Sequence, residues 1–435
     1  MQHISIIGLG KLGACMAATY ASKEHRVIGV DINQNVVNAI NDGKAPVDEK
    51  DLAEYIEKSG ERLRATTDYN DAVKNSDITF IIVPTPTDET GGFTSRYVQK
   101  ACESIGAVLK EKETYHLVVL TSTLLPEVCE EEVISVLEKF SQKKCGKDFG
   151  FCYSPEFIAI GTVIHDLLNP DFFLIGEFDK KSGDILENFY NSVSDNNALC
   201  KRMSITSAEL TKISINSFLT MKITYANMLA EISEHIPGVN VDHVTNALGS
   251  DKRIGKYYLH AGLGFGGPCF PRDNRAFAYM AKKRGVEAPF AQQTDEYNKT
   301  IINRAIKYIK ENIEKGGAVG IIGLSYKPGT YFCEESQAIS IAKQLSEDGY
   351  SVHVFEPYGH SHAKELLGDS VSYCESLNEC IEKSSLLFLS NRDKELSVLP
   401  KLLDSSSRKI ILDPWRQFDK GEFRNSSTYI TFGIR

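Results

Sequence analysis

The sequence lacks an apolar run long enough to cross a membrane. Nowhere in its 435 residues does an apolar stretch approach the roughly 20 residues that a spanning helix needs. The N-terminus also leaves no room for a signal peptide, because Ile4 to Ile7 already has the pattern of a strand. These two absences predict a cytoplasmic protein with no membrane partner.

An excess of positive charge is missing as well. The chain has 49 Lys and Arg residues against 58 Asp and Glu residues, and its net charge is −9. A protein with this balance has no general positive field to attract the phosphates of nucleic acid. Nucleic acid is therefore not an expected partner, whereas an anionic small molecule would require a few cations that converge locally.

The ten cysteines lack the Cys-x-x-Cys spacing of a structural zinc site and the dense pattern of a disulfide framework. We therefore expect no metal, and free thiols in a reducing compartment are the simplest account. A chain of 435 residues is too long for one ordinary core, so two or three domains are expected. Hydrophobic and charged contents of 42% and 25% are typical of a globular protein.

The start of the chain carries a dinucleotide-binding pattern. A strand pattern over residues 3–8 leads into Gly8-Leu-Gly10-Lys11-Leu12-Gly13 and a helical stretch, and a second strand ends on Asp31. In such a turn Gly8 permits the tight bend, Gly10 the approach of the pyrophosphate and Gly13 the packing of helix on strand. The carboxylate of Asp31 would bind ribose hydroxyls and repel a 2′-phosphate, which predicts NAD rather than NADP. The turn residues Lys11 and Leu12 are included in this predicted cofactor site.

Two further strands of this domain end in loops rich in hydroxyl groups. Residues 77–83 are followed by Pro84 and Thr85, and residues 116–120 are followed by a segment that ends at Thr123. If both strand ends lie at the carboxyl edge of a parallel sheet, these residues contact the nicotinamide half of the cofactor. Ordinary turn and cap chemistry is an equally open alternative for them. Strands near Phe151 and over Phe172–Ile175 extend the NAD-binding Rossmann domain to about residue 200.

A central helical domain, residues 201–300, follows. Its longest helical pattern runs from Met203 to Glu234, and Thr206-Ser-Ala-Glu209 has the form of a capping box for its start. Lys212 and Asn216 are four residues apart and share a face of this helix, although a helical lysine is usually a solvated charge. A helix of this length is also suited to dimer contacts.

The loop Gly264-Phe-Gly266-Gly-Pro-Cys269-Phe-Pro-Arg-Asp273 crowds glycines and prolines around one thiol. Glycine permits close backbone approach and proline fixes φ, so the loop holds Cys269 in a rigid turn. The alternative is an inert cysteine in a connection between helices.

The strand and helix pattern restarts in the last domain, residues 316–435. Strands are expected over residues 318–323, 352–355, 386–389 and 410–412, and a helix over 336–347. This domain has no full dinucleotide fingerprint, so it either binds a nucleotide of another kind or is structural. The predicted fold class is therefore α/β, with two Rossmann-like doubly wound parallel-sheet domains joined by a central helical domain with a long helix.

From the Gly8 turn to Asp413-Pro-Trp-Arg416, the order of these parts resembles the UDP-glucose/GDP-mannose dehydrogenase family over essentially the whole chain. The most specific element is the segment that ends at Asp273, which is similar to the catalytic-cysteine segment of that family. The resemblance implies oxidation of the C6 alcohol of a nucleotide sugar to a carboxylate with two NAD⁺ per turnover, in a homodimer or higher homo-oligomer.

The resemblance also implies roles for individual residues. Cys269 would carry the thiohemiacetal and thioester, Lys212 and Asn216 would stabilise the alkoxide and oxyanion, and Asp273 or Glu156 would activate water. Thr123 would lie near this water and the nicotinamide. Expected substrate contacts, besides Lys212 and Asn216, are Phe157, Arg253, Tyr258, Gly266, Tyr326, Lys327 and Arg416, with Arg253 or Arg416 coming from a neighbouring subunit.

The chain departs from the family pattern at Ile160, at His260 and over Tyr331 to Glu334. These positions lie near the expected sugar and phosphate environment. UDP-glucose is the first substrate expected, and a UDP-N-acetylhexosamine, GDP-mannose or a rarer nucleotide sugar are alternatives. A β-hydroxyacid dehydrogenase would leave the cysteine loop and the last domain unexplained, and a non-catalytic NAD-binding sensor would leave Cys269, Lys212, Asn216 and Asp273 without a role.

Overall fold

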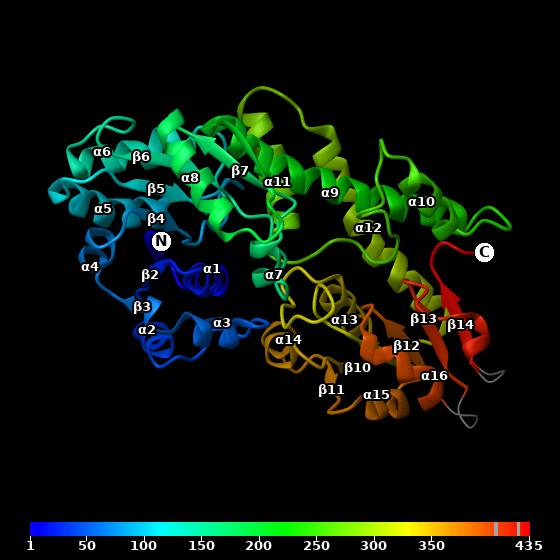
Figure 1. The fold of residues 1–435 in the computed structure, drawn as a ribbon. Coiled ribbons are helices and arrows are strands. Elements are labelled where there is room, and N and C mark those ends of the chain that lie inside the picture. The colour runs from blue at the N-terminus through cyan, green and yellow to red at the C-terminus, as the bar shows by residue number, and fades with distance from the viewer. Residues whose placement is uncertain (404–407, 424–426) are drawn as a thin grey trace. The chain divides into compact units, whose positions relative to one another are not determined.

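A computed structural model describes residues 1–403, 408–423 and 427–435 (Figure 1). The chain divides into two compact units, Met1–Ser214 and Ile215–Arg435. The long helix α9 (Ile205–Ser233) contains the boundary between them. Each unit is built around one twisted sheet.

The first unit has an eight-stranded sheet in the order β3-β2-β1-β4-β5-β6-β7-β8. Its first six strands have the order of a dinucleotide-binding domain, which reverses direction between β1 and β4. All neighbouring strands are parallel except β6 and β7, which are antiparallel. The strands are β1 (His3–Ile7), β2 (Arg26–Val30), β3 (Leu63–Thr66), β4 (Ile78–Ile81), β5 (Leu117–Leu120), β6 (Gly150–Tyr153), β7 (Phe172–Glu177) and β8 (Leu199–Ser204).

Helices cover both faces of this sheet because its central strands are apolar on both sides. Side chains of α1, α2, α3, α7 and α8 pack in one core layer, and those of α4, α5 and α6 pack in the other. The helices are α1 (Lys11–Ser22), α2 (Gln34–Asn41), α3 (Leu52–Ser59), α4 (Tyr69–Lys74), α5 (Arg96–Glu111), α6 (Ser135–Ser141), α7 (Val163–Leu168) and α8 (Lys180–Val193). A π-helical segment, Cys129–Ile134, precedes α6.

The second unit has a six-stranded sheet in the order β11-β10-β9-β12-β13-β14, with all pairs parallel. Its order repeats that of β1 to β6, with the reversal between β9 and β12. The strands are β9 (Ala318–Ile322), β10 (Ser351–Phe355), β11 (Ser372–Tyr373), β12 (Leu386–Leu389), β13 (Ile410–Asp413) and β14 (Thr428–Thr431).

Two core layers again enclose this sheet. Helices α12, α13 and α14 pack on one face, and α15 and α16 on the other. The helices of the unit after α9 are α10 (Val241–Ser250), α11 (Phe270–Lys283), α12 (Pro289–Asn312), α13 (Gln337–Glu347), α14 (His360–Leu367), α15 (Leu377–Lys383) and α16 (Leu399–Leu402). The predicted α/β fold with two Rossmann-like sheets and a central helical region is confirmed.

Two local predictions about the long helix are wrong. Residues 199–204 form β8, so the long helix begins at Ile205 rather than Met203, and Thr206 lies inside it. The Ser204 hydroxyl accepts from Ser207 N at 3.3 Å at the start of α9, whereas Glu209 points to another segment. Helix α11 begins at Phe270, directly after Cys269.

Candidate active site

The candidate residues fall into two groups, one in each compact unit. Gly8, Asp31, Thr123, Glu156 and Lys212 belong to the first unit. The second unit contains Asn216, Cys269, Asp273 and the loop that begins after β9. Each group is built by the local fold of its own unit.

The glycines of the first turn are required by its geometry. Gly8 has φ +96°, and a Cβ there would lie 2.5 Å from the carbonyl oxygen of Ile82. A Cβ on Gly13 would collide with the carbonyl oxygen of Gly8, because α1 packs tightly on the turn. No atom lies within 4 Å of a Cβ placed on Gly10, which is exposed and caps α1 without a side chain. Lys11 and Leu12 begin the first turn of α1. The open position at Gly10, just before this turn, fits the pyrophosphate of NAD.

Asp31 is held at the end of β2 by the same turn. Its Oδ2 accepts from Leu9 N at 2.8 Å, and its Oδ1 accepts from Asn33 N at 2.8 Å. Each oxygen keeps one acceptor site, because a carboxylate oxygen can accept two hydrogen bonds. The half-buried carboxylate therefore fits the ribose hydroxyls of NAD as well as bracing the turn.

The loops after β4 and β5 are joined at the carboxyl edge of the sheet. Thr85 Oγ1 donates to Thr123 O at 2.8 Å, and Ser122 Oγ donates to Val83 O at 2.6 Å. The hydroxyl of Thr121 is buried and has no hydrogen-bond partner among the residues that the structure describes. Pro84, Thr85 and Thr123 thus lie at the carboxyl edge of the sheet, and their contact with the nicotinamide half of NAD stays a prediction.

Lys212 is buried rather than a solvated surface charge, since its exposed fraction is 8%. Its Nζ donates to the main-chain oxygen of Glu156 at 2.5 Å and lies 4.5 Å from the centre of the Phe157 ring. Burial raises the pKa of the Glu156 carboxyl to about 7, and the charge of Lys212 opposes this rise. The structure therefore brings three predicted residues together: Lys212, Glu156 and Phe157.

Two further carboxylates position this group, and the sequence analysis assigned neither to the site. Glu209, fully buried on α9, accepts from Glu127 N at 2.7 Å and Cys129 N at 2.9 Å, which anchors the segment after Thr123. Glu49 accepts from Gly161 N at 3.0 Å and Val163 N at 3.2 Å, which anchors the loop after Glu156. Neither contact has a local sequence signal, because the partners lie about 80 and 110 residues away in the chain.

Cys269 differs from the other cysteines of the chain. All ten lie in the described residues, none of them forms a disulfide, and only Cys269 is exposed. It occupies the N-cap position of α11, and its main-chain oxygen accepts from Asp273 N at 2.8 Å. A helix N-terminus favours negative charge, which a thiolate or the oxygen of a tetrahedral adduct carries.

Asn216 and Asp273 form a buried pair one turn into α11. Asn216 Nδ2 donates to Asp273 Oδ2 at 2.7 Å, and Arg272 Nη2 donates to Asp273 Oδ1 at 2.8 Å. The exposed fractions of Asn216 and Asp273 are 7% and 1%. The predicted Asn216, Cys269 and Asp273 are thus brought together around the start of one helix.

The glycine loop before Cys269 packs against the loop after β9. A Cβ on Gly267, whose φ is +81°, would lie 2.6 Å from the ring of Tyr326. A Cβ on Gly266 would collide with the carbonyl oxygen of Glu335. Tyr326 and the half-buried Lys327 therefore stand beside the cysteine loop, and a small hollow there is lined by Gly264, Gly266 and Tyr326 among others.

The other predicted substrate contacts are placed differently. Tyr258, with φ +64°, sets its ring edge-on to Phe270 at 6.2 Å, close to Cys269 in the chain. Arg253 is exposed and paired with Asp251 at 2.6 Å. Arg416 makes a bidentate pair with Asp242 at 2.7 and 2.9 Å and donates to the carbonyl oxygens of Ala261, Pro414 and Phe432. A substrate contact by Arg416 would require it to give up some of these bonds.

The described part of the chain has neither a candidate metal site nor a candidate membrane-spanning helix. No group of three or more His, Cys, Asp or Glu side chains is arranged to hold a metal ion. No described helix combines the length and apolar character that a membrane crossing demands.

Known proteins are similar to this chain along most of its length. Three sequence profiles of the UDP-glucose/GDP-mannose dehydrogenase family match it: the NAD binding domain over residues 2–194, the central domain over 206–300 and the UDP binding domain over 320–420. GDP-mannose 6-dehydrogenase of Pseudomonas savastanoi pv. phaseolicola is 34% identical over 425 residues, which are 94% of this chain and 96% of that protein.

Two further relatives carry the other substrate name. UDP-glucose 6-dehydrogenase of Haloferax volcanii is 33% identical over 416 residues, 95% of this chain and 96% of that protein. A solved UDP-glucose dehydrogenase from Pyrobaculum islandicum is 30% identical, with a TM-score of 0.91 and coverage of 100% of this chain and 98% of that one. The NAD turn, the cysteine loop and these matches agree, and the chain belongs to the UDP-glucose/GDP-mannose dehydrogenase family of NAD-dependent nucleotide-sugar 6-dehydrogenases.

Proposed function

We propose that the protein oxidises the C6 primary alcohol of a nucleotide sugar to the carboxylate, with UDP-glucose to UDP-glucuronate as the first reaction to test. The observation that carries this proposal is the exposed Cys269 at the N-cap of α11, one turn from the buried Asn216–Asp273 pair. A single exposed thiol beside a buried carboxylate and amide suits covalent catalysis on a carbonyl carbon.

Bound NAD⁺ supplies a hydride acceptor. Oxidation of an alcohol to an acid consumes two NAD⁺ molecules and one water molecule. Lys212 stabilises the oxygen that becomes an alkoxide and later an oxyanion, because its ammonium is buried and held by Glu156 O. Asn216 donates a further hydrogen bond from the next turn of α9. Asp273 and Glu156 are the candidates for removing the alcohol proton or activating water.

Cys269 keeps the aldehyde from escaping between the two oxidations. Its sulfur adds to the aldehyde carbon to form a thiohemiacetal, which loses a hydride and a proton to become a thioester. Water then attacks the thioester carbon, and the carbon–sulfur bond breaks to release the carboxylate and the thiol. The glycine loop supports this role because Gly267 fixes the backbone before Cys269 against Tyr326.

The candidate substrates differ in their base and in their sugar. Relatives of similar identity are named for GDP-mannose and for UDP-glucose. A UDP-N-acetylhexosamine or a rarer nucleotide sugar is a further candidate, because Ile160, His260 and the segment from Tyr331 to Glu334 depart from the family pattern. The reaction chemistry is the same for each.

A substrate panel tests the proposal. The purified protein is mixed with NAD⁺ and separately with UDP-glucose, UDP-N-acetylglucosamine, UDP-N-acetylmannosamine and GDP-mannose, and NADH absorbance is followed to completion. Two NADH per sugar with one of them supports the proposal, whereas one NADH per sugar indicates a two-electron dehydrogenase. Tight NAD binding without turnover on any of them would favour the non-catalytic sensor.

We also propose that the protein acts in the cytoplasm as a homo-oligomer. None of the ten described cysteines forms a disulfide, which suits a reducing compartment. On α9 the side chains of Phe218, Tyr225 and Ile232 are spaced by seven residues and exposed by 57%, 47% and 47%. An apolar row of this spacing on one helix favours pairing with a second copy. Sedimentation of wild type and of Tyr225→Glu tests this, since a monomeric wild type would exclude it.

A further inference from the structure

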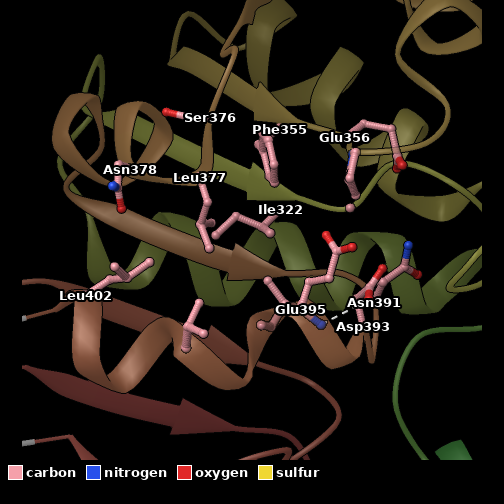
Figure 2. A pocket seen from close by; sticks show the side chains of 14 residues that line it. Ile322, Phe355, Glu356, Ser376, Leu377, Asn378, Asn391, Asp393, Glu395 and Leu402 are labelled. Atoms are coloured by element: carbon pink, nitrogen blue, oxygen red, sulfur yellow. Dashed lines mark hydrogen bonds between the residues drawn. The ribbon is translucent and has the colours of Figure 1, made fainter.

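A cavity at the second sheet is not needed by the proposed reaction. It has a volume of about 340 Å³ and lies at the carboxyl ends of β9, β10 and β12, which flank the reversal of strand order (Figure 2). Ligands of doubly wound sheets bind at this place, and the volume falls in the range of small-molecule sites. The hollow beside the cysteine loop shares only Asn391 with it.

The turn next to this cavity repeats the NAD turn in sequence and in backbone bonding. Residues 6–9 and residues 321–324 are both Ile-Ile-Gly-Leu. Gly8 N donates to Val30 O at 2.8 Å, and Gly323 N donates to Phe355 O at 2.9 Å. An acidic residue follows the second strand in both sheets: Asp31 after β2 and Glu356 after β10. The cavity therefore occupies the place that the adenosine half takes in a dinucleotide-binding domain.

The phosphate-binding part of this second turn is closed. Glu356 Oε2 accepts from Leu324 N at 2.5 Å and Ser325 N at 2.8 Å, and its Oε1 accepts from Tyr358 N at 3.0 Å and Gly359 N at 3.1 Å. Four N–H donors saturate this buried carboxylate. Helix α13 begins fourteen residues after Gly323, whereas α1 begins three residues after Gly8, so no helix N-terminus faces a pyrophosphate here.

The walls of the cavity indicate the chemistry of its ligand. Figure 2 shows the side chains of Ile322, Phe355 and Leu377 gathered on one side, and those of Asn391, Asp393 and Glu395 at the other. The apolar side suits the face of an aromatic ring, and the acidic and amide side suits hydroxyl and amino donors. None of the described lining residues is Lys or Arg, so a phosphate would meet repulsion rather than a counter-charge.

We propose that this cavity binds an uncharged nucleoside at a site separate from the nucleotide-sugar site. Asn391 gives it a route to influence the substrate, because Asn391 Nδ2 donates to Ser325 O at 3.0 Å and to Ser325 Oγ at 3.1 Å. Ser325 directly precedes Tyr326, which stands against Gly267 of the cysteine loop. A bound nucleoside would therefore change the KM for the nucleotide sugar.

Calorimetric titration of the full-length protein with adenosine, guanosine and uridine tests the proposal. We expect one site per chain for at least one nucleoside, about tenfold weaker binding of its 5′-monophosphate, and retention of the site in excess UDP and GDP. Leu377→Trp fills the cavity and should weaken binding at least about tenfold. Leu366→Trp, on the exposed face of α14 outside the cavity, is the matched control and should bind like the wild type.

No binding of any of the three nucleosides at millimolar concentration would overturn the proposal. Displacement of the nucleoside by UDP or GDP would place it in the substrate site and would overturn it as well, as would equal losses in Leu377→Trp and Leu366→Trp. The titration measures binding and needs no turnover. A titration without nucleoside binding would therefore not contradict the proposed reaction, and a substrate panel without NADH formation would not contradict the nucleoside site.

Discussion

Asn216 Nδ2 donates a 2.7 Å hydrogen bond to Oδ2 of Asp273, and both side chains are buried. Arg272 occupies the other oxygen of the same carboxylate. The carboxylate is therefore held in one orientation by a neutral donor from α9 and a cation from α11. Loss of such a donor destabilises the folded protein, because the desolvation of the buried carboxylate is then no longer offset by the hydrogen bond.

Asn216→Ala should therefore reduce both turnover and stability. We expect kcat to fall about 100-fold, because the variant loses the proposed donor to the reacting oxygen and the partner that orients Asp273. The free energy of unfolding should fall by about 1–3 kcal/mol. Steady-state NADH production and urea unfolding measure the two effects.

Ser217→Ala is the control for this variant. The Ser217 hydroxyl donates to Asn274 Oδ1 at 3.0 Å, so its loss removes a neighbouring bond between the same two helices without touching Asp273. We expect a similar or smaller loss of stability and a kcat within about twofold of wild type. Equal loss of kcat in both variants would mean that Asn216 acts only by holding the helices together.

Cys269 should be the one thiol that reacts quickly in the native protein. Titration with a chromogenic disulfide reagent should release about one equivalent per chain in the fast phase, since reactivity requires exposure. Cys269→Ser should lack this phase and lose overall turnover by at least about 1,000-fold, because the aldehyde has no nucleophile to hold it. Cys200→Ser, at the one half-buried thiol, should change neither. Undiminished turnover of Cys269→Ser would exclude the covalent mechanism.

The local parts of the site were predictable from the sequence, and its long-range parts were not. The strand, turn, helix, strand and acid that end at Asp31 lie within one continuous pattern, and the structure confirms each element. The same holds for the cysteine loop, whose glycines are needed because Tyr326 and Glu335 crowd them. Short-range steric requirements leave a signal in the sequence.

Contacts between distant segments leave no such signal. Glu209 was interpreted as part of a capping box, yet its partners are Glu127 N and Cys129 N. The burial of Lys212 depends on a carbonyl oxygen 56 residues away, at Glu156. The pair of Arg416 with Asp242, 174 residues away, also has no local signal, and the substrate contact of Arg416 stays a prediction.

Glu156 should make the stability of the protein depend on pH. Burial raises the pKa of its carboxyl from 4.5 to about 7, with Lys212 opposing the rise and the phenols of Tyr20 and Tyr190 nearby. Between these values the native state keeps a proton that the unfolded state has released. The free energy of unfolding therefore falls as pH rises from about 4.5 to 7, by at most about 3 kcal/mol for a shift of this size.

Glu156→Gln should remove this dependence. The stability difference between variant and wild type should grow in favour of the variant from about pH 5 to about pH 8, measured by urea unfolding. Glu103→Gln, at an exposed carboxylate on α5, is the control and should show a constant difference.

The same variant separates the two candidate bases. If the Glu156 carboxylate activates water, kcat of the wild type should rise with pH, reach half of its plateau near pH 7 and level off above about pH 8, because only the ionised form accepts a proton. In Glu156→Gln this rise of kcat with pH should then be absent, and most of the thioester hydrolysis should be lost. The loss of hydrolysis would be seen as a burst of NADH followed by slow turnover. A variant that keeps the same rise of kcat would assign the role to Asp273 instead.

Gly10→Ala and Gly13→Ala should separate NAD binding from folding. A Cβ at Gly10 meets no protein atom within 4 Å, and the φ of −66° there is open to alanine, so the fold should be unchanged. The methyl group would stand where the pyrophosphate approaches, and the Kd for NADH should rise at least about tenfold.

A Cβ at Gly13 would collide with the backbone of Gly8. Gly13→Ala should therefore lose NADH binding and about 3 kcal/mol or more of stability. Fluorescence titration with NADH and thermal unfolding test this contrast, and normal NADH affinity in Gly10→Ala would mean that the cofactor does not approach this turn.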